Sequence, residues 1–310
     1  MSKDKNEKPK WWDNNGGFFG SQYIIGDDST NGYLPNKQET LEERTQREVD
    51  GIIKLLDLIE NPKIIPNNRR PLILDCPCGY GRHTIELLRK GYHTVGYDIN
   101  DKHLFKAKQK LNTMLRETYP ELKDLDALNL EGFFYKRDMR TLIDCKKWAR
   151  KYDVIFSGAV SEKFDAVINM FYSFGFFETE EENKKVMEEF YKVLKEKGQL
   201  LIHTDVSPEI ILQGKNYKLS EKRNIKNGGQ LHIEESYNPN SKRISGSWTI
   251  IDSEGRTIQL TPYSVRIYSA DEFKSMALNV GFSKVDIYGS FNGDSFAPNS
   301  NEMIVVAKKK

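Results

Sequence analysis

Residues 71 to 100 read PLILDCPCGYGRHTIELLRKGYHTVGYDIN, and this stretch decides the fold. The apolar run Leu72 to Leu74 is typical of a buried parallel strand, and Thr84 to Lys90 has the composition of a helix. Gly79 and Gly81 fall in the turn between them, where glycine lets a backbone approach a ligand closely. The order of strand, glycine loop, helix and second strand predicts a nucleotide-binding unit in an α/β fold.

Two acidic residues of this unit indicate which adenosine ligand it takes. Asp98 ends the second strand, where a carboxylate can accept both hydroxyls of a ribose. A dinucleotide loop needs glycine or alanine at its third position, which Thr84 occupies here, so hydride chemistry is disfavoured. Asp75, which ends the first strand, would repel a pyrophosphate but attracts the ammonium of a bound amino acid. S-adenosylmethionine (SAM) carries that ammonium.

At these residues the sequence resembles the class I SAM-dependent methyltransferases, whose first motif is an acid followed by spaced glycines. The match consists of Asp75, Gly79 and Gly81, with Pro77 in the place of the usual first glycine. This departure leaves the binding mode of Pro77 open. The resemblance implies that these four residues bind SAM, together with two that follow at the end of the second strand, Asp98 and Ile99.

Later stretches extend the resemblance. Tyr135 to Leu142 is similar to the third-strand motif, in which Asp138 would accept from the adenine amino group and the Met139 backbone N–H would meet the ring. Phe164 to Phe177 is similar to the fourth strand and the active-site loop, and places Asn169 at the cofactor. Tyr152–Gly158 competes for the fourth strand, but we choose the later copy because Ser173-Phe174-Gly175 follows it as the resemblance requires.

The resemblance covers the chain from about residue 40 to 310 and implies a Rossmann-like seven-stranded sheet of the class I type. Three strand patterns after the fifth strand add a small antiparallel β insert, which in similar proteins roofs the pocket or makes a dimer contact: Leu231–Tyr237, Arg243–Ile251 and Thr257–Tyr268. The predicted divisions are an N-terminal arm (1–36), a SAM-binding core (37–207), the insert (208–268), and a last helix with a final strand pair (269–310).

Composition excludes some classes of protein. The 310 residues carry a formal net charge of +2, which gives no general attraction to nucleic acid. No run approaches the length of a membrane span, and the N-terminus lacks the apolar core of a signal peptide. Cys76, Cys78 and Cys145 cannot form a fully paired disulfide set, and no second Cys/His pair accompanies Cys76-Pro77-Cys78 at zinc-like spacing. We expect a cytoplasmic enzyme without a metal.

The arm and the leading helix allow two interpretations each. Aromatic residues interrupt the polar start of the chain, and either pack the arm onto the body or form a lid over the ligands. Thr40 to Ile59 has apolar residues at helical spacing. In similar methyltransferases an arginine of this helix reaches the SAM carboxylate, a role open to Arg44 or Arg47, although a solvated position fits both. The arm residues are Trp11, Trp12, Phe18, Phe19 and Tyr23.

No unmistakable catalytic residue stands out. His203 ends the fifth strand, at the edge of the sheet where α/β proteins place ligands. Tyr172, Arg266 and Tyr268 are pocket candidates by location, although ordinary packing explains them equally well. His83 is expected to shape the glycine loop, whereas His93 and His103 look peripheral. A sulfonium is a good leaving group, so a strong base is optional.

The predicted function is the transfer of a methyl group from SAM to a nitrogen or oxygen of a small molecule, with S-adenosylhomocysteine (SAH) as product. Two alternatives remain. A methyltransferase acting on a peptide, protein or nucleic acid would need an open groove in place of a roofed pocket. A non-catalytic SAM-binding regulatory or assembly protein would bind SAM without turnover.

Overall fold

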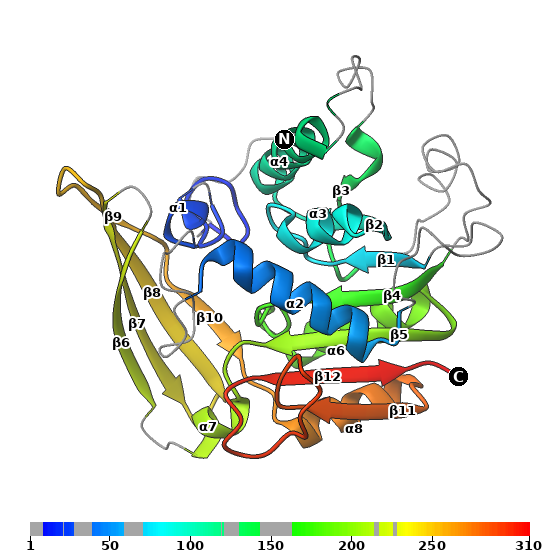
Figure 1. Ribbon diagram of the computed structural model, residues 1–310. Helices are drawn as coiled ribbons and strands as arrows, with labels where there is room; N and C mark the ends of the chain where they lie inside the picture. Colours follow the sequence, from blue (N-terminus) through cyan, green and yellow to red (C-terminus); the bar gives the residue numbers. More distant parts are fainter. Residues whose placement is uncertain are drawn as a thin grey trace, which may run out of the picture.

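A seven-stranded sheet forms the centre of the molecule (Figure 1). The computed structural model describes residues 9–20, 22–27, 39–58, 71–118, 120, 130–142, 163–213, 217–225 and 228–310. The first five strands of the sheet run parallel, and β12 runs antiparallel to both of its neighbours. In spatial order the strands are β11 (Lys284–Tyr288), β12 (Met303–Lys308), β5 (Leu194–Thr204), β4 (Phe164–Asn169), β1 (Leu72–Asp75), β2 (His93–Asp98) and β3 (Phe134–Lys136).

The strand order reverses between β1 and β4, which lie side by side at the centre of the sheet. In open α/β sheets the ligand crevice lies outside the carboxyl ends of the strands at such a switch point. The choice of the second copy, Phe164–Met170, for the fourth strand is confirmed, because β4 pairs with β1 and β5. The competing copy at residues 152–158 lies outside the described residues.

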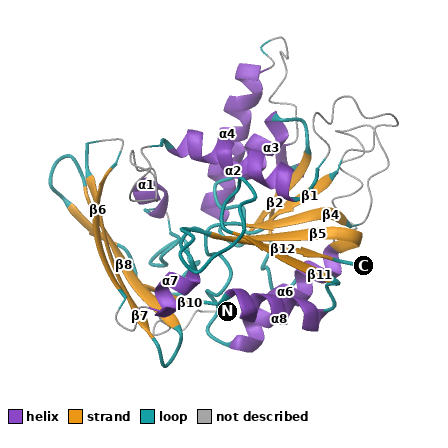
Figure 2. Ribbon diagram, turned by 60° about the horizontal axis from the view of Figure 1, so that its bottom comes forward, coloured by secondary structure: helices purple, strands orange, loops and turns teal. Residues whose placement is uncertain are grey.

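Helices cover both faces of this sheet (Figure 2). One face carries α2 (Leu41–Leu55), α3 (Arg82–Arg89) and α4 (Asp101–Thr118), and the other carries α6 (Glu180–Val193) and α8 (Ala270–Val280). Strand side chains alternate between the two layers. Ile73, Ala166, Ile168 and Ile304 pack with the α2 side, and Leu72, Leu74, Val167 and Val305 with the α6 and α8 side. No described helix is long and apolar enough to cross a membrane.

The insert is a second, antiparallel sheet that stands apart from the first (Figure 1). Its strands follow the short helix α7 (Pro208–Gln213). The prediction of one strand over Thr257–Tyr268 is wrong, because the chain breaks at Leu260–Pro262 into two strands, and proline lacks the N–H that a ladder needs. The strands are β6 (Lys218–Asn224), β7 (Gln230–Asn238), β8 (Arg243–Ile251), β9 (Thr257–Gln259) and β10 (Tyr263–Arg266).

The arm lies between the two sheets (Figure 1). Residues 9–20 and the short helix α1 (Tyr23–Asp27) contribute its aromatic side chains. The Phe18 ring lies 5.3 Å from Trp248 of the insert, between centroids, and Tyr23 stacks on the same indole at 5.1 Å. Trp11 lies 5.1 Å from Phe176, which belongs to the loop after β4. In this structure the arm is therefore packed, and it bridges insert and core.

Candidate functional site

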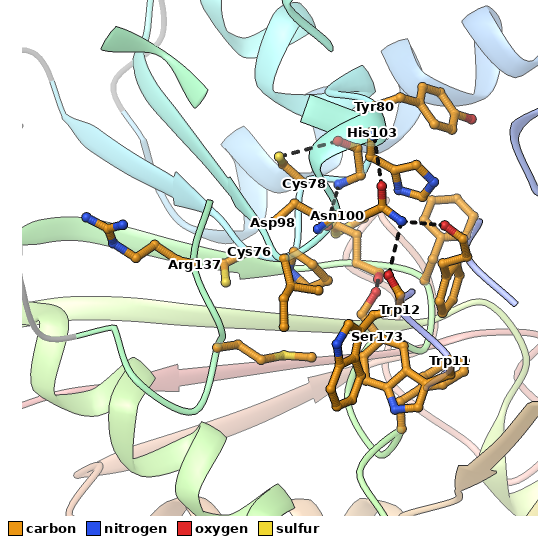
Figure 3. A pocket seen from close by; sticks show the side chains of 18 of the residues that line it. Trp11, Trp12, Cys76, Cys78, Tyr80, Asp98, Asn100, His103, Arg137 and Ser173 are labelled. Atoms are coloured by element: carbon orange, nitrogen blue, oxygen red, sulfur yellow. Dashed lines mark hydrogen bonds between the residues drawn. The ribbon is translucent and has the colours of Figure 1, made fainter. Parts of the chain in front are cut away.

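A cavity lies at the carboxyl ends of β1, β2 and β4 (Figure 3). We call it the first cavity. Four loops and the arm contribute its walls, and the lining residues include Pro77, Gly79, Asp98, Ile99, Asp138 and Met139 of the predicted SAM site. Asp75, Gly81, Asn169 and Arg44 are not among the lining residues.

The two glycines of the loop have different roles. Gly79 lines the cavity at φ +53°, and a Cβ added there would meet no atom within 4 Å. The loop therefore leaves open the space that a side chain would fill, which suits a closely approaching ligand. Gly81, at φ +82°, has no such space, because an added Cβ would lie 2.9 Å from the Cβ of Ala107. Gly81 therefore lets α3 pack against α4 and β3, and its contact with SAM stays a prediction.

Asp98 connects two loops at the floor of the cavity through hydrogen bonds. Its carboxylate accepts the backbone N–H of Gly79 at 2.8 Å and that of Asn100 at 2.8 Å (Figure 3). Burial raises the pKa of this carboxyl. Two backbone bonds leave acceptor capacity on both oxygens, because an ionised carboxylate has about four lone-pair sites. Asp98 can therefore fix the glycine loop and still accept from a ligand, and Ile99 lines the cavity beside it.

Two buried acceptors lie under the floor. Asp75 is fully buried, and its Oδ2 accepts from the backbone N–H of Thr84 at 3.1 Å and from its hydroxyl at 2.6 Å. Asn169 donates its Nδ2 to the Cys76 carbonyl at 2.9 Å. Within the described part of the chain, Oδ1 of Asp75 and Oδ1 of Asn169 have no hydrogen-bond partner. These two acceptors fit the charge of the SAM ammonium, although neither residue lines the cavity.

The Asp75 carboxyl should make stability depend on pH. Burial raises its folded pKa to about 7, above the unfolded value, so its contribution to stability is lost as pH rises from about 4 through about 7. In urea unfolding, the wild-type free energy should fall by about 1 kcal/mol more between about pH 6 and pH 7 than that of Asp75→Asn. Asp50→Asn, on the exposed side of α2, should keep the wild-type pH dependence. Identical profiles for Asp75→Asn and wild type would contradict this assignment.

The third-strand residues lie where the resemblance places the adenine. Asp138 and Met139 both line the cavity. Arg140 donates to the Asp138 carboxylate at 2.6 and 3.1 Å and to Glu182 of α6 at 2.5 Å. Burial alone would raise the pKa of Asp138, but the bonds from Arg140 outweigh it and lower the pKa. Asp138 is therefore a charged acceptor at neutral pH.

A buried charge cluster supports the other side of the cavity, and the sequence did not reveal it. Glu48 of α2 is fully buried and lies 2.8 Å from Arg44 Nε, 3.0 Å from Arg82 Nη1 and 2.9 Å from His83 Nε2. Burial raises the pKa of Glu48, but the two arginines hold it well below the usual value. Burial and Arg82 lower the pKa of His83 to about 4, so the imidazole is neutral at pH 7.

Of the two arginines that contact Glu48, Arg82 is the one that lines the cavity. Arg44 is 1% exposed, does not line the cavity, and is committed to Glu48. Arg82 lines it, and both guanidinium carbons lie 4.2 Å from the centre of the Phe171 ring, a cation–π distance. A contact of Arg44 with SAM stays a prediction, although in this structure Arg82 is the nearer of the two to the cavity wall. Arg47 pairs with Glu39 at 2.8 Å. The sequence signal for Arg82 was its place directly after Gly81.

Asn100 links the cavity floor to the arm. Its Nδ2 donates to the backbone carbonyls of Trp12 at 3.2 Å and Phe19 at 2.7 Å, and its Oδ1 accepts the N–H of His103 (Figure 3). Trp12, Phe19 and Tyr23 in turn line the cavity. The expectation that His103 is peripheral is wrong, because it is 3% exposed and lines the cavity from the first turn of α4.

A second cavity lies next to the first, between the insert, the arm and the carboxyl edge of the main sheet. Four residues line both cavities: Phe19, Tyr23, Phe171 and Phe176. Tyr172 lines the second cavity, and its hydroxyl donates to the Val206 carbonyl at 2.6 Å. Of the four predicted catalytic candidates, Tyr172 is the one found among the described lining residues of the two cavities.

The other three candidates lie outside both walls. His203 is fully buried, with its Nε2 3.1 Å from Glu302. Along β10, Val265 and the following Ile267 face the second cavity, so Arg266 and Tyr268 point the opposite way. Arg266 pairs with Glu180 at 2.6 Å and Glu272 at 2.7 Å, and Tyr268 donates to Glu180 at 2.7 Å. These two residues therefore fasten the insert to α6 and α8.

The two described cysteines lie in the loop after β1. Cys76 and Cys78 are free and buried, and burial raises the pKa of both thiols, which keeps them protonated. In the described ranges no three His, Cys, Asp or Glu side chains gather in a group that could hold a metal ion. Cys145 lies outside the described residues.

The strand order with its antiparallel β12, the glycine loop at the switch point and the acid ending β2 define a class I SAM-dependent methyltransferase. The chain belongs to the methyltransferase domain family, whose family model matches residues 71–237. Over 220 residues it is 23% identical to a glycine/sarcosine/dimethylglycine N-methyltransferase of Actinopolyspora halophila, covering 71% of this chain. The chain spans 32% of that relative's length.

Solved structures agree on the fold. The CcbJ methyltransferase from Streptomyces caelestis superposes with a TM-score of 0.64 at 14% identity, covering 90% of this chain and 100% of that one. The SAM-bound CalS10, an amino pentose methyltransferase from Micromonospora echinaspora, gives 0.53 at 18% identity, again over 90% and 100%. At these identities the similarity shows a shared fold.

Proposed function

We propose that this protein transfers the methyl group of SAM to a nitrogen or oxygen of a small molecule. The observation that carries the proposal is the pair of adjoining cavities with four shared lining residues. The first lies at the switch point, where this fold class binds its nucleotide-like ligand, and the second supplies a separate space for an acceptor. The shared residues are where donor and acceptor would meet.

The residues of the first cavity fit SAM. The open space at Gly79 would admit the ligand beside the loop, and Asp98 would accept from the ribose. Asp138 would accept from the adenine amino group, next to Met139 and Ile99. Arg82 would face the SAM carboxylate. Beneath the floor, Asp75 and Asn169 would stabilise the ammonium at a distance, while Pro77 lines the wall.

Bound SAM supplies an electrophilic methyl carbon, to which an acceptor lone pair forms a bond as the carbon–sulfur bond breaks and its electrons pass to sulfur. The chain contributes alignment and exclusion of water. Trp11, Trp12 and Phe177 form an aromatic wall of the first cavity. Burial raises the pKa of Tyr172 well above its usual value, so this hydroxyl stays protonated and can position an acceptor but does not act as a base.

The walls of the second cavity suit a small acceptor. The arm and the insert both line it, and they touch through the contacts of Phe18 and Tyr23 with Trp248. A peptide or nucleic acid would need an open groove instead. Two of the relatives are named for small acceptors, glycine with its methylated forms and an amino pentose. Formation of SAH with a small acceptor distinguishes this proposal from a SAM-binding regulatory protein, which would show none.

Removing the Asp98 carboxylate tests the cofactor site. Asp98→Ala should weaken SAM binding by roughly 1 to 3 kcal/mol, because hydrogen bonds to a charged group are lost and the glycine loop loses its anchor. Calorimetric titration with SAM measures the change, and circular dichroism checks the fold. Asp101→Ala removes an exposed acid three residues away, which pairs with Lys136, and should leave SAM affinity unchanged. An Asp98→Ala protein that folds and binds SAM like wild type would refute the ribose assignment.

A further inference from the structure

The second cavity carries an excess of negative charge. Three carboxylates and one guanidinium are among its described lining residues. Arg223 is committed to Glu221, with nitrogen to oxygen distances of 2.6 and 2.8 Å. Asp205 lies 3.9 Å from Arg44, which makes its shorter contact, 2.8 Å, to Glu48. The remaining carboxylate is Glu235.

Glu235 differs from the other two carboxylates in its partners. It lies on β7, and its hydrogen bonds come from tyrosine hydroxyls: Tyr263 donates to Oε1, and Tyr217 donates to Oε2 at 3.3 Å. Both tyrosines line the cavity with it. Burial raises the pKa of the Glu235 carboxyl, with Asp205 adding repulsion, and the tyrosine bonds and Arg223 oppose the change. The Glu235 carboxylate keeps free lone-pair sites. Among the described residues it has no ion-pair partner, because Arg223 pairs with Glu221.

Aromatic rings share the cavity with this carboxylate. Phe18, Tyr23, Trp248 and Tyr263 line the same cavity, and the centroid distances from Phe18 to Trp248 and Tyr263 are 5.3 and 4.4 Å. Ring faces attract cations, and the attraction grows where water is excluded. An anion would meet repulsion from Glu235 and Asp205, and a neutral alcohol would gain nothing from the charge. The walls therefore favour a cation with an apolar body.

We propose that the second cavity binds the methyl acceptor as an amine, whose protonated form is held by the Glu235 carboxylate within the aromatic wall. This inference rests on the proposed function and narrows its acceptor from nitrogen or oxygen to nitrogen. The amine gives up one proton to solvent before the transfer, since the attacking nitrogen needs its lone pair. That pair then forms the carbon–nitrogen bond while the carbon–sulfur bond breaks, so the positive charge passes from sulfur to nitrogen.

A matched pair of probes tests the charge preference. We choose 2-phenylethylamine, protonated at neutral pH, and 2-phenylethanol, which has the same aromatic body without the charge. The protein is saturated with SAH and titrated with each probe by ligand-observed NMR. The dissociation constant of the amine should be lower than that of the alcohol by about tenfold or more. In Glu235→Gln the preference should fall to about onefold, because the amide keeps the shape and loses the charge.

Glu234→Gln is the matched control. Glu234 is the exposed neighbour of Glu235 on β7, bonded to Ser220 at 2.7 Å, and its substitution should leave the preference as in wild type. Equal affinities for the two probes, no binding of the amine, or an unchanged preference in Glu235→Gln would overturn the inference. Calorimetry with SAH distinguishes failure of this inference from failure of the proposed function. If SAH binds but the amine is not preferred, only this inference is refuted. If SAH does not bind, the proposed function is refuted as well.

Discussion

Replacing Glu48 with alanine should destabilise the protein by about 3 to 5 kcal/mol, the usual result of removing one partner from a buried ion pair. Glu48 is fully buried and lies within 3.0 Å of both Arg44 and Arg82. Without it, two guanidinium groups would lose the carboxylate that balances their charge beside the first cavity. Urea unfolding followed by circular dichroism measures the change in the free energy of unfolding.

The control for this substitution is on the same helix. Glu42→Ala removes an exposed glutamate of the first turn of α2 and should change stability by no more than about 1 kcal/mol. Glu48→Gln separates charge from shape, since glutamine fills the space without neutralising the arginines, and should also be strongly destabilising. If Glu48→Ala unfolds at the same urea concentration as Glu42→Ala, the cluster does not hold the site together.

Gly81→Val should destabilise the fold by about 2 to 5 kcal/mol through two separate costs. A branched residue at φ +82° is strained, and its Cβ would lie 2.9 Å from Ala107 and 3.0 Å from Phe134. The clash would push α3 away from α4 and β3, and the loop of the first cavity would move with it. Thermal and urea unfolding should both report the loss, with SAM affinity falling as a consequence.

A second glycine separates strain from clash. Gly255 has a similar φ of +79°, but a Cβ there would meet no atom within 4 Å. Gly255→Val, in the turn between β8 and β9, should therefore cost only the backbone strain of about 1 to 3 kcal/mol. Equal destabilisation by the two substitutions would mean that the contact with Ala107 and Phe134 adds nothing.

The cofactor side of the site was predictable because its residues follow one another in a single strand, loop, helix and strand unit. Gly79 and Asp98 lie in that unit at positions fixed by the strand ends, and the structure places both at the first cavity. The roles of Arg82 and Asn100 in the same unit depend on partners distant in sequence, Glu48 and the arm carbonyls. No local pattern could show those contacts.

The acceptor side was less predictable because register decides which side chains face inwards. Arg266 and Tyr268 looked suited to a pocket by position alone, yet the alternation along β10 turns them towards α6 and α8. The strand β6 was missed because two of its inward residues, Glu221 and Arg223, are charged and its outward residues are polar, so no apolar alternation marks it. Glu235 lies at an inward position of the predicted strand β7, but its tyrosine partners come from other segments, which no local pattern could show.

The arm gives the two cavities a common wall. Phe19 and Tyr23 line both of them, and Asn100 ties the arm backbone to the strand end that carries Asp98. A ligand that shifts these two rings in one cavity reshapes the other at the same time. Donor and acceptor affinities are then thermodynamically coupled, and the coupling is reciprocal: whatever factor SAM or SAH imposes on acceptor binding, the acceptor imposes on theirs.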